Sequence, residues 1–247
     1  MRQIKSLWPC RKYVRMWGLQ GLMIFRILRS ARKTVVAVSI PEYGLIHLRS
    51  GTPDVTVLEH VLIDKDYDYS YPIEPQTIID LGAHIGLSAI WFAKRFPNAR
   101  IFCVEPDPSN FEILVENLRN YGERVVCINA AISSVPVESL PFLAGASHAG
   151  RIAGKEQSQC DCIDVSACTV AEIMRDYALS QVDLLKIDIE GYERELFSSE
   201  SGWLEMVSMC IIEVHEELAR GATLAIYSSF NDFRICFRHG EHDIFWR

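Results

Sequence analysis

The chain has 247 residues, of which 49% are hydrophobic, and a net charge of −7. This length and composition are enough for one domain with a sizeable core and a small appendage. The charge is uneven, because residues 1–33 hold nine Lys or Arg and no acid, while the rest of the chain has 16 basic and 32 acidic residues. The acidic body argues against a nucleic-acid partner for the main domain.

Residues 1–33 are predicted to form a basic amphipathic helix. The uncharged run 16–25 is too short to span a bilayer, which needs about 20 apolar residues. No small-x-small cleavage site follows it, so a signal peptide is poorly supported. The large apolar side chains on or near the apolar side are Trp8, Trp17, Leu22 and Phe25. Such a helix could lie on an anionic membrane surface; the other interpretation is that it packs on the domain or on a partner subunit.

The eight cysteines include no Cys-x-x-Cys pair. Those in apolar, strand-like runs are expected to be buried and reduced: Cys103, Cys127, Cys210 and Cys236. A metal cluster of His148, Cys160, Cys162 and Cys168 is disfavoured, because its spacing fits no common zinc pattern. We therefore expect a cytoplasmic protein, placed at the inner face of a membrane if the basic tail binds lipid.

Residues 34–76 are predicted to form a small cap ahead of the main domain. Two β-rich runs, 34–40 and 43–49, are separated by Pro41 and Glu42 and predict a hairpin. The apolar run 55–63 has helix-compatible spacing.

From Thr77 to the C-terminus, strands alternate with helices, which predicts a parallel sheet covered on both faces. The expected strands are centred on 78–79, 101–104, 125–128, 182–189 and 209–214, and a terminal hairpin of 233–239 and 243–247 completes a mostly parallel seven-stranded sheet. Helices are expected at 87–96, from Ser109 with a capping box to Glu112, from Thr169 with a capping box to Glu172, and at 222–230. Residues 133–168 are expected to be irregular and, together with residues 34–71, to shape a binding pocket.

The stretch 77–86, TIIDLGAHIG, is the first sign of function. A strand, a glycine loop with Gly82 and Gly86, and a helix start together form a cradle for a nucleotide-like cofactor. Sites for NAD usually carry G-x-G-x-x-G, whereas here Asp80 precedes the first glycine. An acid at that place would repel a pyrophosphate but could accept a hydrogen bond from an ammonium group. The pattern therefore favours S-adenosylmethionine over NAD.

In open α/β sheets, ligands bind beyond the carboxyl ends of the strands. Glu105, at the end of the second strand, is placed to bind both hydroxyls of a ribose. The small residues after the third strand leave room for an adenine ring. The expected cofactor-binding residues are Asp80, Gly82, His84, Gly86, Glu105, Asn129, Ala130 and Ala131.

Several of these motifs, DLGAHIG, VEPDPSNFEILVENL, INAAIS, LLKIDIEGYE and IIEVH, resemble the FkbM-type family of S-adenosylmethionine-dependent methyltransferases, and the likeness runs from about Gly44 to His215. The resemblance implies a Rossmann-like class I methyltransferase fold. It also implies an O-methyltransferase that acts on hydroxyls of sugars, glycolipids, polysaccharides or polyketide-type products. His84 departs from the family, whose members commonly have Asn there. The basic tail lies outside the likeness.

Methyl transfer to a hydroxyl requires a group that removes the proton. Lys186, Asp188 and Glu190 are expected on one side of the fourth strand, close to the end of the fifth strand. We expect His215, Asp188 or Glu190 to be the base, with histidine favoured by its ordinary pKa. Lys186 either holds the acceptor or forms a structural ion pair.

Three alternatives remain open at this point. A divalent cation could be held by Asp188, Glu190, Glu213 and His215 and acidify the hydroxyl. The chain could be an NAD-linked sugar oxidoreductase, or a noncatalytic membrane-tethered binding protein that keeps the fold without the chemistry.

Overall fold

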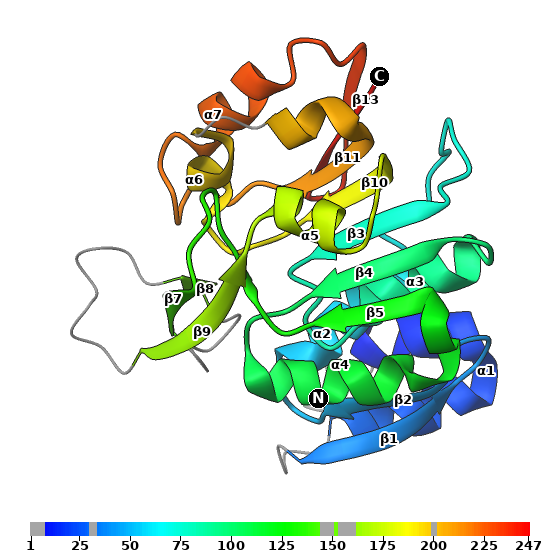
Figure 1. Cartoon of the computed structure of the whole chain (residues 1–247). Coiled ribbons are helices and arrows are strands. Elements are labelled where there is room, and N and C mark those ends of the chain that lie inside the picture. The colour runs from blue at the N-terminus through cyan, green and yellow to red at the C-terminus, as the bar shows by residue number, and fades with distance from the viewer. Residues whose placement is uncertain (1–7, 30–33, 144–150, 153–161, 199–201) are drawn as a thin grey trace.

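The computed structural model describes residues 8–29, 34–143, 151–152, 162–198 and 202–247. Its centre is a seven-stranded sheet with the order β12-β13-β11-β10-β3-β4-β5, shown in Figure 1. The strands of this sheet are β3 (Thr77–Leu81), β4 (Arg100–Val104), β5 (Val125–Ile128), β10 (Val182–Ile187), β11 (Val207–Glu213), β12 (Ile235–His239) and β13 (His242–Trp246). The first five run parallel, and β13 pairs antiparallel with both β11 and β12. The class I methyltransferase fold with a C-terminal antiparallel hairpin is thus confirmed.

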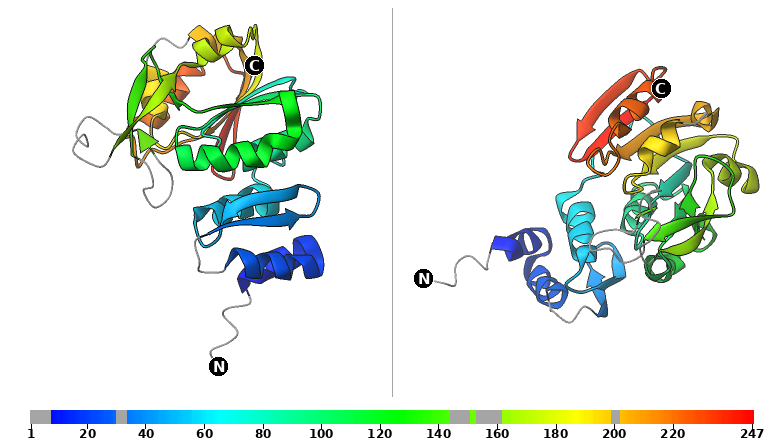
Figure 2. Two further views of the ribbon diagram at one scale, coloured as in Figure 1. Left: turned by 60° about the horizontal axis from the view of Figure 1, so that its bottom comes forward. Right: turned by 90° about the vertical axis from the view of Figure 1, so that its left-hand side faces the viewer.

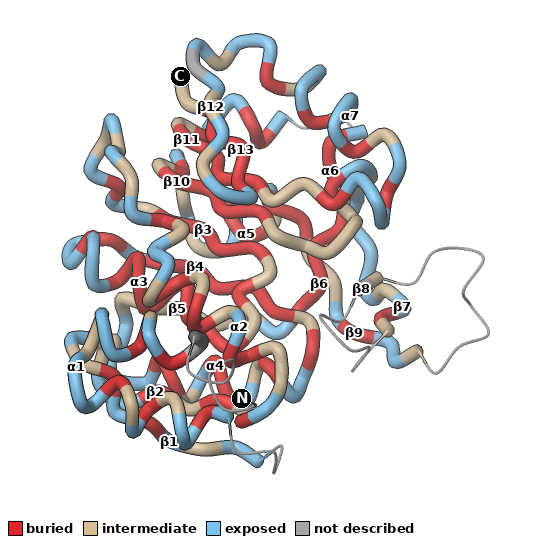
Figure 3. Tube along the Cα trace, turned by 180° about the vertical axis from the view of Figure 1, so that it is seen from behind, coloured by how far each residue is buried: buried red, intermediate tan, exposed pale blue. Residues whose placement is uncertain are grey.

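Helices cover both faces of this sheet, and its central strands are buried from both sides (Figure 3). One face carries α3 (Leu87–Arg95) and α4 (Pro108–Leu118), and the other carries α5 (Val170–Asp176), α6 (Glu193–Ser198) and α7 (Ala222–Ser229). Neighbouring residues of β3 divide between the faces: Ile78 packs toward α3, and Ile79 packs toward α5. This alternation follows from the period of two along a strand.

The predicted helix starts were right in one case and wrong in another. Thr169 and Glu172 form the expected capping box at the start of α5. Helix α4, however, begins at Pro108 with Asp107 as its cap, and the Asp107 carboxylate accepts from the backbone N–H groups of Ser109 and Asn110. Proline fits the first helical position because its missing N–H would be unpaired there anyway, so the helix starts earlier than Ser109.

The prediction that residues 133–168 are irregular is wrong for the described part of that segment. A second, smaller sheet has the order β6-β9-β7-β8 and is formed by β6 (Ala131–Ile132), β7 (Ser139–Leu143), β8 (Arg151–Ile152) and β9 (Ile163–Cys168). Phe142 and Val165 form its small buried core. The sheet stands beside the carboxyl ends of the main strands, where Figure 1 shows β9 rising past the end of β5.

The cap is the predicted hairpin, β1 (Val35–Ile40) and β2 (Gly44–Arg49), followed by α2 (Pro53–Leu58) and a π-helical turn η1 (Glu59–Asp64). Two further turns of 3₁₀-helix, η2 (Arg119–Arg124) and η3 (Gly202–Met206), precede β5 and β11. The cap shares one continuous core with the α3 side of the main sheet. Asn117 of α4 joins them, because its side chain bonds the backbone of His47 in β2 and the carbonyl of Ile85 in the glycine loop.

Helix α1 (Trp8–Leu28) packs on the cap, and Figure 2 shows it at the end of the molecule farthest from the main sheet. The chain bends sharply at Trp17 and Gly18. Trp17 and Phe25 pack against the core, so their predicted side of the helix faces the protein. Tyr13 is fully buried and donates to Glu59 at 2.7 Å. Among the described residues, no helix is both long and apolar enough to cross a membrane.

The cysteine predictions hold in part. Cys103 and Cys210 are buried, and Cys127 is half-buried. Cys236 is exposed, because β12 is the edge strand of the main sheet, so the prediction of burial is wrong there. The disfavoured cluster includes His148 and Cys160, which lie outside the described residues.

Candidate active site

A pocket opens at the carboxyl ends of the main strands, between the glycine loop, the cap and the small sheet. Its empty volume, including the open solvent at its mouth, is about 900 Å³. The predicted site residues on its wall are Gly82, His84, Glu105, Ala130, Ala131, Lys186, Asp188 and Glu190. Val57 and Tyr67 contribute from the cap, and Phe142 contributes from the small sheet. Both contributions come from segments that the sequence predicts to shape the pocket, 34–71 and 133–168.

The glycine loop folds tightly over the end of β10. Gly82 has a φ of +75°, and a Cβ there would lie 1.7 Å from the carbonyl oxygen of Asp188. His84 is also left-handed, with a φ of +51°. Asn and His are among the non-glycine residues that tolerate this conformation best, which accounts for either residue at this position. Gly86 caps α3 with a φ of +86° and lies behind the pocket wall.

Asp80 does not reach the pocket. Its side chain is fully buried, accepts a hydrogen bond from the Ser88 hydroxyl, and pairs with Lys186 at 3.1 Å. That Asp80 accepts from a cofactor ammonium group stays a prediction, because in this arrangement its carboxylate contacts Ser88 and Lys186. Asp80 joins β3 to α3 and to β10.

Lys186 is the buried cation of this ion-pair group. Its Nζ lies 3.1 Å from Asp80 and 3.4 Å from Asp188, and it donates to the Gly82 carbonyl at 2.8 Å. Burial alone would lower the pKa of Lys186, but the charges of Asp80 and Asp188 outweigh it and hold that pKa well above the ordinary value. The sequence predicts that Lys186 either holds the acceptor or forms a structural ion pair, and the structure shows the ion pair.

Glu105 lies at the mouth of the glycine loop, where the sequence placed it. Its carboxylate accepts from the backbone N–H groups of His84 (2.9 Å) and Asp107 (3.0 Å) and from the Asn110 amide (3.2 Å). Burial raises the pKa of Glu105 to about 7 although these hydrogen bonds lower it. A carboxylate has about four acceptor positions, so about one remains for a ligand. Asn129 lies off the wall and donates to the Glu105 carbonyl.

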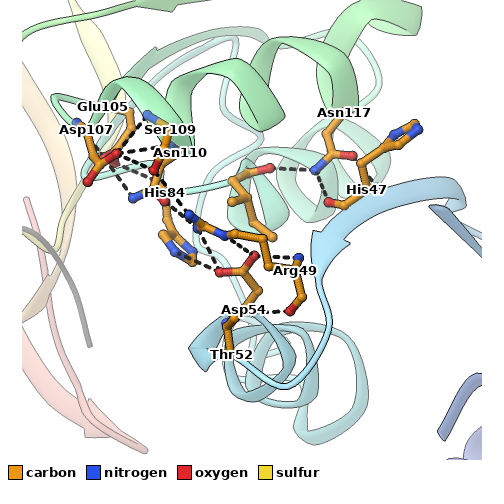
Figure 4. A network of polar contacts seen from close by, with 11 residues as sticks. His47, Arg49, Thr52, Asp54, His84, Glu105, Asp107, Ser109, Asn110 and Asn117 are labelled. Carbon is orange, nitrogen blue, oxygen red and sulfur yellow. Dashed lines mark hydrogen bonds and ion pairs between the residues drawn. The ribbon is translucent and has the colours of Figure 1, made fainter. Parts of the chain in front are cut away.

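A charged group in the cap supports the loop and was missed by sequence reasoning (Figure 4). Asp54 is buried and takes two hydrogen bonds at 2.9 Å from the Arg49 guanidinium. Arg49 also reaches Ser109 and Asn110 at the start of α4. Asp54 lies 3.4 Å from Nε2 of His84. The cap thus contacts the cofactor loop through this Arg49–Asp54–His84 group.

His84 is neutral and has one nitrogen without a partner. Burial lowers its pKa, although the charge of Asp54 raises it. Nδ1 of His84 is buried and has no hydrogen-bond partner among the described residues. With Asp54 beside Nε2, the proton is favoured on Nε2, which leaves the Nδ1 lone pair as an acceptor at the pocket wall.

The end of β10 is a strained turn. Glu190 has a φ of +50° and the following Gly191 has +93°. The strand ends at Ile187, so the period-two argument does not extend to Glu190, yet the turn returns Glu190 to the pocket beside Asp188. Such strained residues cluster at functional sites. Burial, together with the charges of Asp188 and Glu213, raises the pKa of Glu190 to about 7.

His215 lies within an acidic group behind this turn. Nδ1 is 2.9 Å from the fully buried Glu193, which sequence reasoning missed. Nε2 lies 3.5 Å from Glu213 and 3.6 Å from Glu190. Burial would lower the pKa of His215, but these acids raise it to about 11. A protonated imidazole cannot accept a proton, so of the three predicted bases this arrangement favours Asp188 or Glu190 over His215.

The predicted metal ligands only partly come together. Among the described residues, Asp188, Glu213 and His215 each offer one ligand atom within 4.8 Å of the others. Glu190, the fourth residue of the predicted set, lies outside that group. His215 holds these acids together as a cation in the present arrangement, and a divalent cation would have to replace its proton.

The pocket fits S-adenosylmethionine in three respects. Ala130 and Ala131 give a flat, apolar wall, Glu105 has an acceptor position left, and the Nδ1 acceptor of His84 lacks a partner. The positively charged cofactor also suits a wall that carries Asp188 and Glu190.

Comparison with known proteins identifies the family of the chain. A match to the family described as "Methyltransferase FkbM domain" covers residues 80–240. The chain is 27% identical over 193 residues to methyltransferase sdnD of Sordaria araneosa, covering 65% of this chain and 74% of that protein. It is 24% identical over 146 residues to the hexuronic acid methyltransferase AglP of Haloferax volcanii, covering 58% of this chain and 57% of that protein.

Among solved structures, methyltransferase FkbM from Methylobacillus flagellatus is similar with a TM-score of 0.47 and 14% identity. The chain spans about half of that protein, since 47% of it is covered, along with 76% of this chain. The family match takes in the strand ends, the glycine loop and the acidic turn, and it removes the oxidoreductase and noncatalytic alternatives. This chain belongs to the FkbM family of S-adenosylmethionine-dependent methyltransferases.

Proposed function

We propose that this enzyme methylates a hydroxyl group of a neutral sugar, glycolipid, polysaccharide or polyketide-type acceptor, with Glu190 as the general base. The observation that carries the proposal is the turn that holds Glu190 on the pocket wall with a pKa of about 7. A base with a pKa near the working pH is the most effective in proton transfer.

The cofactor would be held by His84, Glu105, Ala130 and Ala131, with Gly82 allowing the loop to approach β10. When bound, S-adenosylmethionine supplies an electrophilic methyl group on a positively charged sulfur. The buried pair of Asp80 and Lys186 keeps the loop and the end of β10 in place and has no direct part in the chemistry.

The proton of the acceptor hydroxyl passes to an oxygen of Glu190. Asp188 differs from Glu190, because the charges of Lys186 and His215 hold its pKa below the ordinary value in spite of burial. Asp188 is thus a weaker base and would instead accept a hydrogen bond from a second hydroxyl of the acceptor. His215 stabilises the acids of this turn as a cation.

The negative charges on the pocket wall favour an acceptor that is itself uncharged. AglP is described as acting on a hexuronic acid, which carries a carboxylate. Here, Asp188 and Glu190 would repel such a group, and Lys186 is the sole Lys or Arg among the described pocket-lining residues and is already paired. We therefore place uronic acids below neutral sugars and polyols in the acceptor ranking.

Calorimetric titration with S-adenosylmethionine, S-adenosylhomocysteine and NAD is the first test, and we expect binding of the first two only. Transfer of a labelled methyl group is then measured on neutral glycosides, the matching uronides and polyols. We expect Glu190→Gln to keep cofactor affinity and lose about a hundredfold or more in turnover. Glu217→Gln, an exposed acid, is the control. Transfer to uronides alone, or full turnover in Glu190→Gln, would contradict the proposal.

The same assay tests the divalent cation as the alternative. With a chelator present, the proposed base mechanism keeps its rate, whereas a cation held by Asp188, Glu213 and His215 would be removed and the rate would fall. Restoration by Mg²⁺ or Mn²⁺ would then identify the cation as necessary.

A further inference from the structure

The outer side of helix α1 carries an apolar stripe. Leu19, Met23 and Ile27 follow one another at intervals of four residues, so they lie on one side of the helix. Leu19 is 85% exposed, Met23 66% and Ile27 40%. The opposite side, with Ile24 and Leu28, is already buried in the core. The exposed stripe is therefore not needed for packing on the cap, and it calls for a partner outside the chain.

The bend in α1 holds this stripe in place. Gly18 takes a left-handed φ of +59°, and a Cβ on Gly21 would lie 2.0 Å from the Tyr13 carbonyl oxygen. The two halves of the helix therefore lie directly against each other, and the second half keeps one fixed orientation. Figure 2 shows α1 as the outermost layer of the molecule, at the end away from the main sheet.

The helix that carries the stripe also carries positive charge. Arg11, Arg15 and Arg26 are exposed and have no acidic partner among the described residues, whereas Lys12 is paired with Glu59 at 2.7 Å. In the sequence, residues 1–33 hold nine basic residues and no acid. The rest of the chain has twice as many acids as bases. The charge is thus concentrated on the end of the molecule that exposes the stripe.

We propose that this face, defined by Leu19, Met23, Ile27 and the three free arginines, binds the surface of an anionic lipid bilayer. The stripe would enter the boundary between headgroups and acyl chains, and the arginines would contact the headgroup phosphates. A second copy of the chain fits less well, because it would bring two strongly positive ends together. The face differs from the side predicted from sequence, since Trp17 and Phe25 point into the protein.

The test is sedimentation of the full chain with vesicles of phosphatidylcholine, with and without phosphatidylglycerol. We expect binding that requires phosphatidylglycerol and weakens in high salt. Each arginine near an anionic surface contributes about a factor of five in affinity. Replacing Arg11, Arg15 and Arg26 by Gln should therefore weaken binding about a hundredfold. Replacing Leu19, Met23 and Ile27 by Ser should weaken it by more than about tenfold.

Two matched variants serve as controls. Leu224→Ser removes another strongly exposed leucine, from α7 in the main domain. A triple Gln variant of Arg220, Arg234 and Arg238 removes the same charge from exposed positions elsewhere. Both should bind vesicles as the unchanged chain does, and all variants should keep its melting temperature, because the replaced side chains are exposed.

Three results would overturn the proposal. The first is absence of binding to phosphatidylglycerol vesicles by the unchanged chain. The second is binding that the stripe variant retains. The third is a dimer in size-exclusion chromatography that the stripe variant abolishes, which would make this face an interface between copies. The measurement is of binding alone, so its outcome is independent of the proposed acceptor and base.

Discussion

Replacing Glu105 by Gln should remove a defined part of the pH dependence of stability. Burial raises the pKa of Glu105 from 4.5 to about 7. Between these values the unfolded chain releases the proton of this carboxyl, whereas the folded chain keeps it. A carboxyl whose folded pKa is raised contributes stability that is fully present below pH 4.5 and lost as the pH rises through 7. The free energy of unfolding should therefore fall across this window.

The size of the effect follows from the two pKa values. The full difference corresponds to about 3 kcal/mol, of which about 2.5 kcal/mol falls between pH 5 and pH 8. Gln cannot ionise, so the variant should not show this fall in the free energy of unfolding. Gln also replaces one acceptor oxygen with an amide that cannot accept from His84 or Asp107, which destabilises the variant. The loss of these hydrogen bonds lowers the stability of the variant equally at every pH. The two proteins are therefore compared by how much their free energies of unfolding change with pH.

Urea unfolding followed by tryptophan fluorescence at pH 5, 6, 7 and 8 measures this change. Glu112→Gln is the control, because Glu112 is an exposed acid on α4 and should follow the unchanged chain. The reasoning is refuted if the unfolding free energies of the unchanged chain and Glu105→Gln run parallel over the whole range. That result would mean that Glu105 ionises in the folded protein near its ordinary pKa.

Three further changes follow from the geometry. Gly82→Ala should cost about 3 kcal/mol or more of stability, measured by urea unfolding, because its Cβ meets the backbone of Asp188 at 1.7 Å. Lys186→Met should cost about 3–5 kcal/mol, because it leaves the fully buried Asp80 without its cation. The rate of methyl transfer should rise about tenfold per pH unit below pH 7 and level off above it, and Glu190→Gln should abolish this rise.

Each of these changes has a matched comparison. Gly122→Ala introduces the same residue at a φ of +58° with no atom within 4 Å, so it should cost only about 1–2 kcal/mol. Equal costs at both glycines would refute the close approach of the loop to β10. Combining Lys186→Met with Asp80→Asn should restore part of the lost stability, and absence of any restoration would contradict the ion pair. A pH–rate profile that is unchanged in Glu190→Gln would move the base to another residue.

The strands, most helices and the glycine loop could be predicted from the sequence because their signals are local. Ile78 and Ile79 predict a strand whatever the rest of the fold is. Thr169 and Glu172 cap a helix through contacts that span only four residues. The start of α4 was misplaced by a local competitor, Asp107. The small sheet was missed for a different reason. Two of its strands, β6 and β8, have only two residues each, which is too short for a periodic pattern. In addition, β6 pairs with β9, which lies far along the chain.

The sequence by itself determined the order of the elements, the pocket at the strand ends and the kinds of residue there, because strand topology brings those ends to one edge. Tertiary structure decided what each residue does. Asp80 lies behind the wall because Lys186 and Ser88 enclose it. The pKa of His215 is raised because Glu193, 22 residues earlier, lies against it. A pKa depends on burial and on charges brought from distant positions, so the roles of acid, base and ion pair at this site follow only from the folded chain.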